Sequence, residues 1–491
     1  MSNDADGLLS RTATGVRWTV FGRVAIQVLG LGFAIALARL VTPEEFGVYG
    51  MAFVVLQLAM YVEAMRLEAA IVQARDVAPS DMTTVAVFGF VFGCTTATVF
   101  LLAAPLVGVV FDIPESVVVL RVMSVVVVIR SIFLVHRALL KRRLLFRRQT
   151  IIDITTVLAG GSAAVAAAAA GWGVWALVVY LVVRVLVECA GTIIAAPWLP
   201  SASPSRRALK RLLRFGVPSS GSELLLYAQF NLTDIAVAGI YGSAPLGFFR
   251  QANALLSKPV AYFDDVVNRL AFPVMSRRWH ATGDVGSGYL RAFAMMTAAA
   301  APAAVAMALL APELVGVFYG ERWVAAVPLL QLLAPLALFR VWQPLTSAAF
   351  HALGQPFEEF RVNAGVVLGL AALLWFTRDL GINFTVLSLV AAFAIHAVAT
   401  HTIVCRLVGI PWQRLAGRLV APATGCLAMA AVALLGRFVV PDLPHGLTLL
   451  VLAPPVCASY VGVLHVVDRG LLAEARDWMT GRVGRRNIAD V

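Results

Sequence analysis

Long apolar runs, separated by short polar breaks, make up almost the whole chain. A transmembrane helix needs about 20 apolar residues to cross about 30 Å of hydrocarbon. The strands of a membrane barrel are about 10 residues long and alternate in polarity, which these runs do not. The candidate spanning helices are 16–40, 46–73, 82–108, 114–138, 150–170, 173–196, 212–240, 246–274, 286–311, 322–353, 362–377, 382–405, 415–436 and 446–467. The pattern therefore predicts an all-α integral membrane protein with about 14 transmembrane helices.

One polar break occurs twice, 200 residues apart. The segment 39–50 is matched by the segment 240–250, so that Gly47 aligns with Gly247. A Pro/Ser-rich and then basic stretch, 197–214, separates the two copies. Because six spans return the chain to the same side of the membrane, the copies would form a parallel repeat around a central site. The expected domains are an N-terminal six-helix bundle (1–200), a C-terminal six-helix bundle (201–405), an appended helix pair (406–470) and a cytoplasmic tail (471–491).

Basic residues in the loops predict the orientation. With the N-terminus in the cytoplasm, the inward loops and tails carry about 25 Lys and Arg residues, and the outward loops carry about four. Such a bias is the usual signature of the cytoplasmic side. We therefore expect both termini to be cytoplasmic, which requires an even number of spans.

The composition narrows the classes of function. The chain is 60% hydrophobic and 13% charged, which leaves no room for a sizeable soluble domain. The net charge of +12 lies in short interhelical loops rather than on one face of a folded domain, so we expect no nucleic-acid partner. The five cysteines form no CxxC pair, and HExxH and GxxxxGK[ST] motifs are absent. We therefore expect no metal site, no cofactor and no catalytic residue.

Several ionisable residues lie within the apolar runs, where each costs about 2.5–3.5 kcal/mol unless it faces a cavity or a partner. Some stand three or four residues from an opposite charge, as Glu63 and Arg66 or Arg184 and Glu188 do, and can neutralise each other. The candidate cavity cations are Arg23, Arg130, Lys258, Arg340, Arg66 and Arg250. The first four have no carboxylate three or four residues away. Unpaired cations suit an anionic substrate such as a diphosphate, which arginine can bind in a bidentate manner.

An ordered set of motifs resembles the bacterial polysaccharide-export flippases. The segments Ala36-Leu-Ala-Arg-Leu-Val-Thr-Pro-Glu-Glu-Phe-Gly47 and Gly171-Trp-Gly-Val-Trp-Ala-Leu-Val178 resemble the first-half motifs. The second-half motifs are 215–219, 231–234, 246–252, 272–277 and 352–356. Together they resemble the Wzx-type branch of the multidrug/oligosaccharidyl-lipid/polysaccharide exporter superfamily over about 350 residues.

This resemblance implies two six-helix bundles in a V-shaped transporter of the bacterial inner membrane. The implied activity is to move undecaprenyl-diphosphate-linked oligosaccharide repeat units from the cytoplasmic to the outer leaflet by alternating access. Such a protein is not an enzyme, and it would serve exopolysaccharide or lipopolysaccharide biosynthesis. Its partners would be the lipid-linked oligosaccharide, membrane lipids and the polymerase and chain-length machinery of the same pathway. Glu63, Glu223 and Asp234 are candidates for coupling to an ion gradient.

Two other functions fit the same helices. A multidrug antiporter of the same superfamily would share the fold, but it would favour acidic cavity groups for cationic drugs. A membrane glycan polymerase or ligase would usually carry a long outer loop, whereas no outer loop expected here exceeds about 15 residues. The excess of unpaired basic groups favours the flippase.

Overall fold

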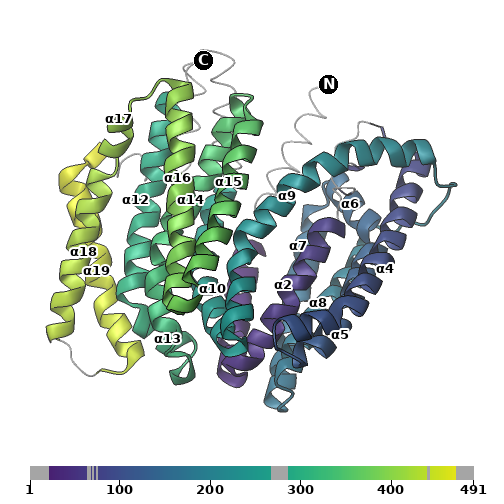
Figure 1. The fold of residues 1–491 in the computed structure, drawn as a ribbon, viewed down its shortest axis with the longest axis horizontal. Coiled ribbons are helices and arrows are strands. Elements are labelled where there is room, and N and C mark those ends of the chain that lie inside the picture. The colour runs from purple at the N-terminus through teal and green to yellow at the C-terminus, as the bar shows by residue number, and fades with distance from the viewer. Residues whose placement is uncertain are drawn as a thin grey trace. The chain divides into compact units, whose positions relative to one another are not determined.

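The computed structural model describes residues 22–63, 68, 71–72, 76–266, 286–439 and 443–470. Every regular element in these ranges is helical (Figure 1). The chain divides into two compact units, Met1–Gly247 and Phe248–Val491. The boundary expected at 200/201 separates the two copies of the sequence repeat, not two compact units, and it stays a prediction.

The first unit is a bundle of long apolar helices. They are Gly22–Leu40, α2 (Pro43–Glu63), α4 (Pro79–Val110), α5 (Glu115–Ile132), α6 (Leu134–Arg142), α7 (Phe146–Ala169), α8 (Val174–Ala195), α9 (Arg206–Tyr241) and the first residues of α10 (Ser243–Val266). Small residues let α7 approach its neighbours closely. A Cβ on Gly161 would lie 2.1 Å from the Phe33 ring, and one on Gly160 would lie 2.4 Å from the Arg184 side chain. The Gly160-Gly161 step therefore serves packing, as small residues commonly do in membrane helices.

The second unit contains the remainder of α10 and the helices that follow. They are α12 (Gly286–Leu309), α13 (Ala311–Phe318), α14 (Ala326–Ala352), α15 (Pro356–Thr377), α16 (Ile382–Val408), α17 (Trp412–Gly417), α18 (Val420–Val439) and α19 (His445–Val467), with short 3-10 turns Glu321–Trp323 and Arg378–Leu380. The last pair, α18 and α19, packs on α12 through a buried cluster that includes Ala294, Met429 and Val456. The Tyr460 hydroxyl donates to the Ala298 carbonyl at 2.7 Å, which fixes the pair to α12.

Where the structure describes them, the predicted spans coincide with helices, and the protein is an all-α integral membrane protein. Among the described residues, 11 helices are long and apolar enough to cross a membrane, or 12 if the pair α5 and α6, bent by 47°, forms one span. Helices α2 and α10 match the second and eighth predicted spans but are not among these 11. The total of 14 therefore stays a prediction.

Candidate functional site

A buried arginine joins three helices of the second unit. Arg340 of α14 is 7% exposed. Its Nη1 donates to Asn253 Oδ1 at 3.0 Å and to Ser257 Oγ at 2.9 Å, both on α10. The guanidinium also lies 5.6 Å from the centre of the Phe393 ring on α16. These contacts hold the positive charge in one place, which a substrate-binding group requires.

The next residue along α10 after Ser257 is also a cation. The Lys258 Nζ atom is enclosed, and it has no hydrogen-bond partner in the part of the chain that the structure describes. An ammonium group carries three donors, and burying it without a partner is expensive. Arg250 lies on the same helix, two turns before Ser257 and therefore on the same face. This face of α10, together with Arg340, is the strongest candidate in the second unit for binding an anion.

Two prolines flank the arginine within its helix. Pro335 and Pro344 both lie inside α14. A proline has no N–H to bond the carbonyl four residues earlier, so Pro344 frees the carbonyl of Arg340 itself. The hydrogen-bond ladder of α14 is therefore interrupted beside the candidate site.

The other predicted site residues lie in the first unit or outside the described parts. Arg23 is exposed near the start of Gly22–Leu40, and Arg130 is half-buried in the last turn of α5. Asp234 of α9 is buried, with 5% of its surface exposed. Arg66 and the side chains of Glu63 and Glu223 lie outside the described residues. The roles of Arg23 and Lys258 as cavity cations stay predictions.

One expected ion pair is replaced by a wider network. Glu188 lies 3.8 Å from Arg137 Nη1, and Arg184 instead donates to the Tyr180 hydroxyl at 3.4 Å, with its guanidinium 5.1 Å from the Tyr180 ring centre. The expectation that Arg184 and Glu188 neutralise each other is therefore wrong. Glu188 instead lies next to Arg137 of α6, a contact that helical spacing within α8 could not reveal.

Glu68 is the centre of this network. Its Oε2 accepts a hydrogen bond from Arg137 Nε at 2.7 Å, and its Oε1 forms an ion pair with Lys141 Nζ at 2.7 Å. Glu68 and Arg137 are 69 residues apart in sequence, so no local pattern links them. The Glu68 side chain is only 15% exposed, which makes its two ion pairs stronger than pairs at the surface.

Glu68→Gln is expected to lower the free energy of unfolding by about 2 kcal/mol, because it leaves the half-buried Arg137 and the more exposed Lys141 without their carboxylate. Thermal unfolding of the detergent-purified protein measures this. Glu358→Gln is the matched control, since Glu358 forms an exposed pair with Arg361 at 3.0 Å, and it should leave the melting temperature within experimental error. Equal melting temperatures for the two variants would show that the network does not stabilise the unit.

The twice-occurring break has a clear structural role in its first copy. Thr42 and Glu45 form a reciprocal cap at the start of α2, because the Thr42 N–H donates to Glu45 Oε2 at 2.8 Å and the Glu45 N–H donates to Thr42 Oγ1 at 3.3 Å. Pro43 is the first residue of α2, where its missing N–H costs nothing. The Thr-Pro-Glu-Glu sequence thus fixes where α2 begins.

The glycine of this motif meets the start of α10. A Cβ on Gly47 would lie 1.8 Å from the Ser243 carbonyl oxygen, and a Cβ on Gly247 would lie 1.9 Å from the Pro43 carbonyl oxygen. The sequence repeat pairs Gly47 with Gly247 and Pro43 with Ser243, so the contact is reciprocal. Only glycine permits this approach, since the atoms in the way are backbone. We call these four residues the glycine crossing.

Among the described residues, no group of three or more His, Cys, Asp or Glu residues could hold a metal ion. The five cysteines are free thiols.

Two relatives of this chain are named for the biosynthesis of teichuronic acid and of lipopolysaccharide. The chain is 23% identical over 360 residues to the teichuronic acid biosynthesis protein TuaB of Bacillus subtilis (strain 168), covering 72% of this chain and 74% of TuaB. It is 24% identical over 347 residues to the lipopolysaccharide biosynthesis protein WzxC of Escherichia coli (strain K12), covering 69% and 70% of the two chains.

Two solved structures share the fold. The lipid II flippase MurJ, in an inward closed conformation, has a TM-score of 0.74 and 13% identity, covering 92% of this chain and 99% of MurJ. An inward-facing multidrug resistance MATE family transporter of the MOP superfamily has a TM-score of 0.59 and 17% identity, covering 78% and 95%. At these identities the likeness concerns the fold alone.

The predicted resemblance is thereby confirmed at the level of the family. A family model described as "Polysaccharide biosynthesis protein" matches residues 36–328, which is more than half of the chain. The glycine crossing and the face of α10 that carries Arg250 and Lys258 lie within the matched range. The protein belongs to this polysaccharide biosynthesis family.

Proposed function

We propose that the protein moves a lipid-linked oligosaccharide, an undecaprenyl-diphosphate-linked repeat unit, from the cytoplasmic to the outer leaflet by alternating access. The observation that carries this proposal is the enclosed Lys258 ammonium, without a hydrogen-bond partner among the described residues and adjacent to the residue that holds Arg340. A buried cation in a membrane protein needs an anion. In a family of polysaccharide biosynthesis, the diphosphate of a lipid-linked sugar is an anion of the right chemistry.

The two cations would divide the work. Arg340 is held by Asn253 and Ser257, so its guanidinium could meet phosphate oxygens in a fixed geometry. Lys258, with three rotatable donors, would adapt as a point charge. The diphosphate would bind most strongly while the site is dry and would leave once water entered, because water weakens each charge–charge attraction.

Three finer parts of the proposal follow from the loop charges and the relatives. The protein resides in a bacterial inner membrane with both termini in the cytoplasm, as the basic loops predict. It works beside the polymerase and chain-length machinery that uses the flipped unit. Asp234, buried in α9, is the described candidate for coupling transport to an ion gradient. MurJ, which has this fold, is named for flipping lipid II, and ExoT of Rhizobium meliloti (strain 1021), 26% identical over 336 residues, is named a succinoglycan biosynthesis transport protein.

Deleting the gene is expected to leave complete lipid-linked repeat units facing the cytoplasm and to remove the surface polymer. The measurement is mass spectrometry of the extracted lipid, combined with an impermeant reagent that reports which leaflet holds the sugar. Units that reach the outer leaflet normally but stay unpolymerised would contradict the proposal and favour a polymerase or ligase.

Because a MATE family transporter has the same fold, a multidrug antiporter is the second candidate function. It predicts that the deletion strain makes normal surface polymer and becomes sensitive to cationic drugs. The same strain therefore separates the two functions in one experiment.

A further inference from the structure

One end of the first unit is strongly basic. Two short segments there, 141–148 at the α6–α7 turn and 205–211 at the start of α9, contain no acidic residue. Their exposed cations are Lys141, Arg143, Arg147, Arg148, Arg206, Arg207, Lys210 and Arg211. We call this set the basic end surface. Lys141 and Arg211 also bind carboxylates, while most of the set projects outward.

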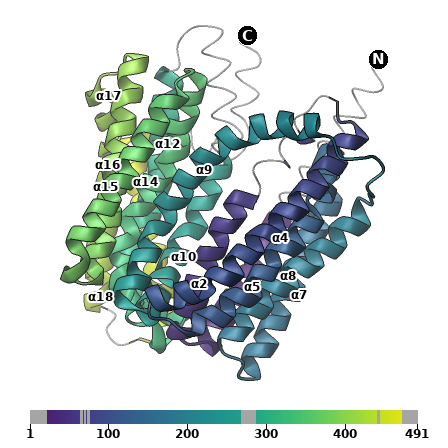
Figure 2. The same ribbon diagram turned by 45° about the vertical axis from the view of Figure 1, so that its right-hand side comes forward.

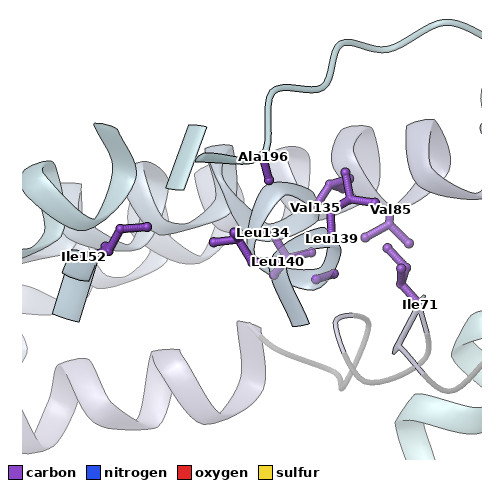
Figure 3. Packing of buried hydrophobic residues seen from close by; sticks show 9 residues of the cluster. Ile71, Val85, Leu134, Val135, Leu139, Leu140, Ile152 and Ala196 are labelled. Atoms are coloured by element: carbon purple, nitrogen blue, oxygen red, sulfur yellow. The ribbon is translucent and has the colours of Figure 1, made fainter. Parts of the chain in front are cut away.

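A buried core connects the helix that precedes the α6–α7 turn with α4, the helix to which the start of α9 is bonded. In this core, Ile71, Val85, Ile152 and Ala196 pack together with Leu134, Val135, Ala138, Leu139 and Leu140 of α6 (Figure 3). Hydrogen bonds fix the margins of this core.

The start of α9 is attached to the start of α4. The Ser205 N–H donates to Thr84 Oγ1 at 2.9 Å, and Arg211 Nη2 lies 2.7 Å from Asp81 Oδ2. On the other segment, Arg148 Nη1 donates to the Ala195 carbonyl at 2.7 Å. The surface is therefore a fixed part of the first unit.

Helix α9 is much longer than a membrane crossing requires. Its 36 residues span about 54 Å at 1.5 Å each, against about 30 Å of hydrocarbon. Among its described side chains, the segment Leu224–Tyr241 is long and apolar enough to cross. Figures 1 and 2 show a curved helix whose first turns lie across the end of the bundle near α4. These first turns carry Arg206, Arg207, Lys210 and Arg211, so they belong at the membrane surface.

Apolar side chains project from the same end. Leu144 is 59% exposed, Phe146 is 37% exposed and Leu199 is 82% exposed. Leu144 has a φ of 53°, at a position where helices usually place glycine. The Leu144 N–H donates to the Lys141 carbonyl and the Leu145 N–H to the Leu140 carbonyl, both at 3.1 Å, which is the hydrogen-bond pattern of a Schellman helix end. Leu144 thus combines an unfavourable backbone conformation with an exposed side chain, and an apolar surrounding would stabilise that side chain.

We propose that the basic end surface binds the phosphate groups of anionic phospholipids in the cytoplasmic leaflet, with Leu144 and Phe146 inserted at the boundary between headgroups and acyl chains. Clustered Lys and Arg residues at a membrane surface attract anionic lipids, and exposed apolar side chains anchor such a surface in the headgroup region. Nucleic acid or an acidic protein would match the charge but not the projecting leucine and phenylalanine. The choice of leaflet rests on the orientation given under the proposed function, whereas lipid binding itself does not.

The test uses the full-length protein in mixed micelles with phosphatidylglycerol or phosphatidylcholine. Thermal unfolding and native mass spectrometry measure the stabilisation and the lipids retained. We expect phosphatidylglycerol, and not phosphatidylcholine, to raise the melting temperature of the wild type. The double variants R143Q/R147Q and R206Q/R207Q should each lose at least half of that rise and of the retained lipid. The control R322Q/R378Q, which removes two exposed cations of the second unit, should keep both.

Leu144→Gly provides an independent variant that should fold at least as well, because glycine adopts positive φ without strain. Its melting temperature without lipid should equal or exceed that of the wild type, while the rise caused by phosphatidylglycerol should shrink. Two results would overturn the proposal: an equal effect of the two lipids on the wild type, or an unchanged rise in both double variants. Neither measurement involves transport, so failure of the flippase proposal would leave this result standing, and the reverse is also true.

Discussion

Replacing Gly47 by alanine is expected to reduce surface polymer at least tenfold while the protein still reaches the membrane. The added Cβ would lie 1.8 Å from the Ser243 carbonyl oxygen, 2.4 Å from its carbonyl carbon and 2.8 Å from its Cα. Backbone atoms cannot rotate away as the end of a side chain can. Bringing the first distance to 3.0 Å requires a shift of at least 1.2 Å between the start of α2 and the start of α10. In close-packed helices a shift of this size is felt by every neighbour.

Within the proposed mechanism, the glycine crossing would take part in closing the outer end of the transporter. Both helices begin directly after loops that the positive-inside rule places outside, so the crossing lies at the predicted outer end. A transporter that alternates its access must form and break close contacts at that end. A side chain at Gly47 or Gly247 would therefore disturb closure more than folding, because the cap of α2 by Thr42 and Glu45 stays intact.

The repeat supplies a stringent version of this test. Gly247→Ala should have an effect similar to Gly47→Ala, because its Cβ would lie 1.9 Å from the Pro43 carbonyl oxygen. Both changes separate the same two helices. The double variant should therefore lose less surface polymer, on a logarithmic scale, than the sum of the losses in the two single variants, as expected for coupled sites. Gly30→Ala is the matched control, since nothing lies within 4 Å of a Cβ there. Polymer at the wild-type level in Gly47→Ala would exclude the crossing as a moving contact.

The sequence predicted those features that depend on local spacing or on internal similarity. The lengths of the apolar runs predicted the helices because each span must satisfy its own backbone hydrogen bonds in lipid. The repeat aligned Gly47 with Gly247, and the structure places these two positions in one reciprocal contact. The reason for the glycines could not be read from the sequence, because a Cβ clash exists only between helices that are distant along the chain.

The charged residues within the spans also show that a sequence does not reveal contacts between distant helices. The absence of a nearby carboxylate singled out Arg340 and Lys258, because i, i+4 spacing is visible in a sequence, and their role in a site stays a prediction. The partners of Arg340, Asn253 and Ser257, lie 87 and 83 residues away. The pair Arg184 and Glu188 had suitable spacing and still did not form, because Arg137 approaches Glu188 from another helix. Local spacing predicts which charges need a partner better than it predicts which partner they take.

Lys258→Met is expected to reduce flipping at least tenfold and, at the same time, to leave the melting temperature unchanged or higher. Methionine keeps much of the length of lysine but has no charge to bury. The wild-type Nζ is enclosed without a hydrogen-bond partner among the described residues, so removing it relieves an uncompensated desolvation cost. A lysine that served only structure would move both measurements in the same direction. A loss of flipping together with an unchanged or higher melting temperature would therefore indicate that the lysine is retained to bind an anionic substrate. Functional residues commonly lower the stability of the protein that carries them.

The measurements for Lys258→Met are the leaflet distribution of lipid-linked repeat units in the complemented deletion strain and thermal unfolding of the purified variant. Lys258→Arg should restore part of the activity, because it returns the charge with a different donor geometry. Ser257→Ala should lower activity less, about threefold to tenfold, since Arg340 loses the bond to Ser257 but keeps the bond to Asn253 at 3.0 Å. Arg322→Met, at an exposed cation of the same unit, is the control for a general loss of positive charge. Normal transport by Lys258→Met would remove the observation on which the proposed diphosphate site rests, and the cation would have to be sought in the first unit, at Arg23 or Arg130.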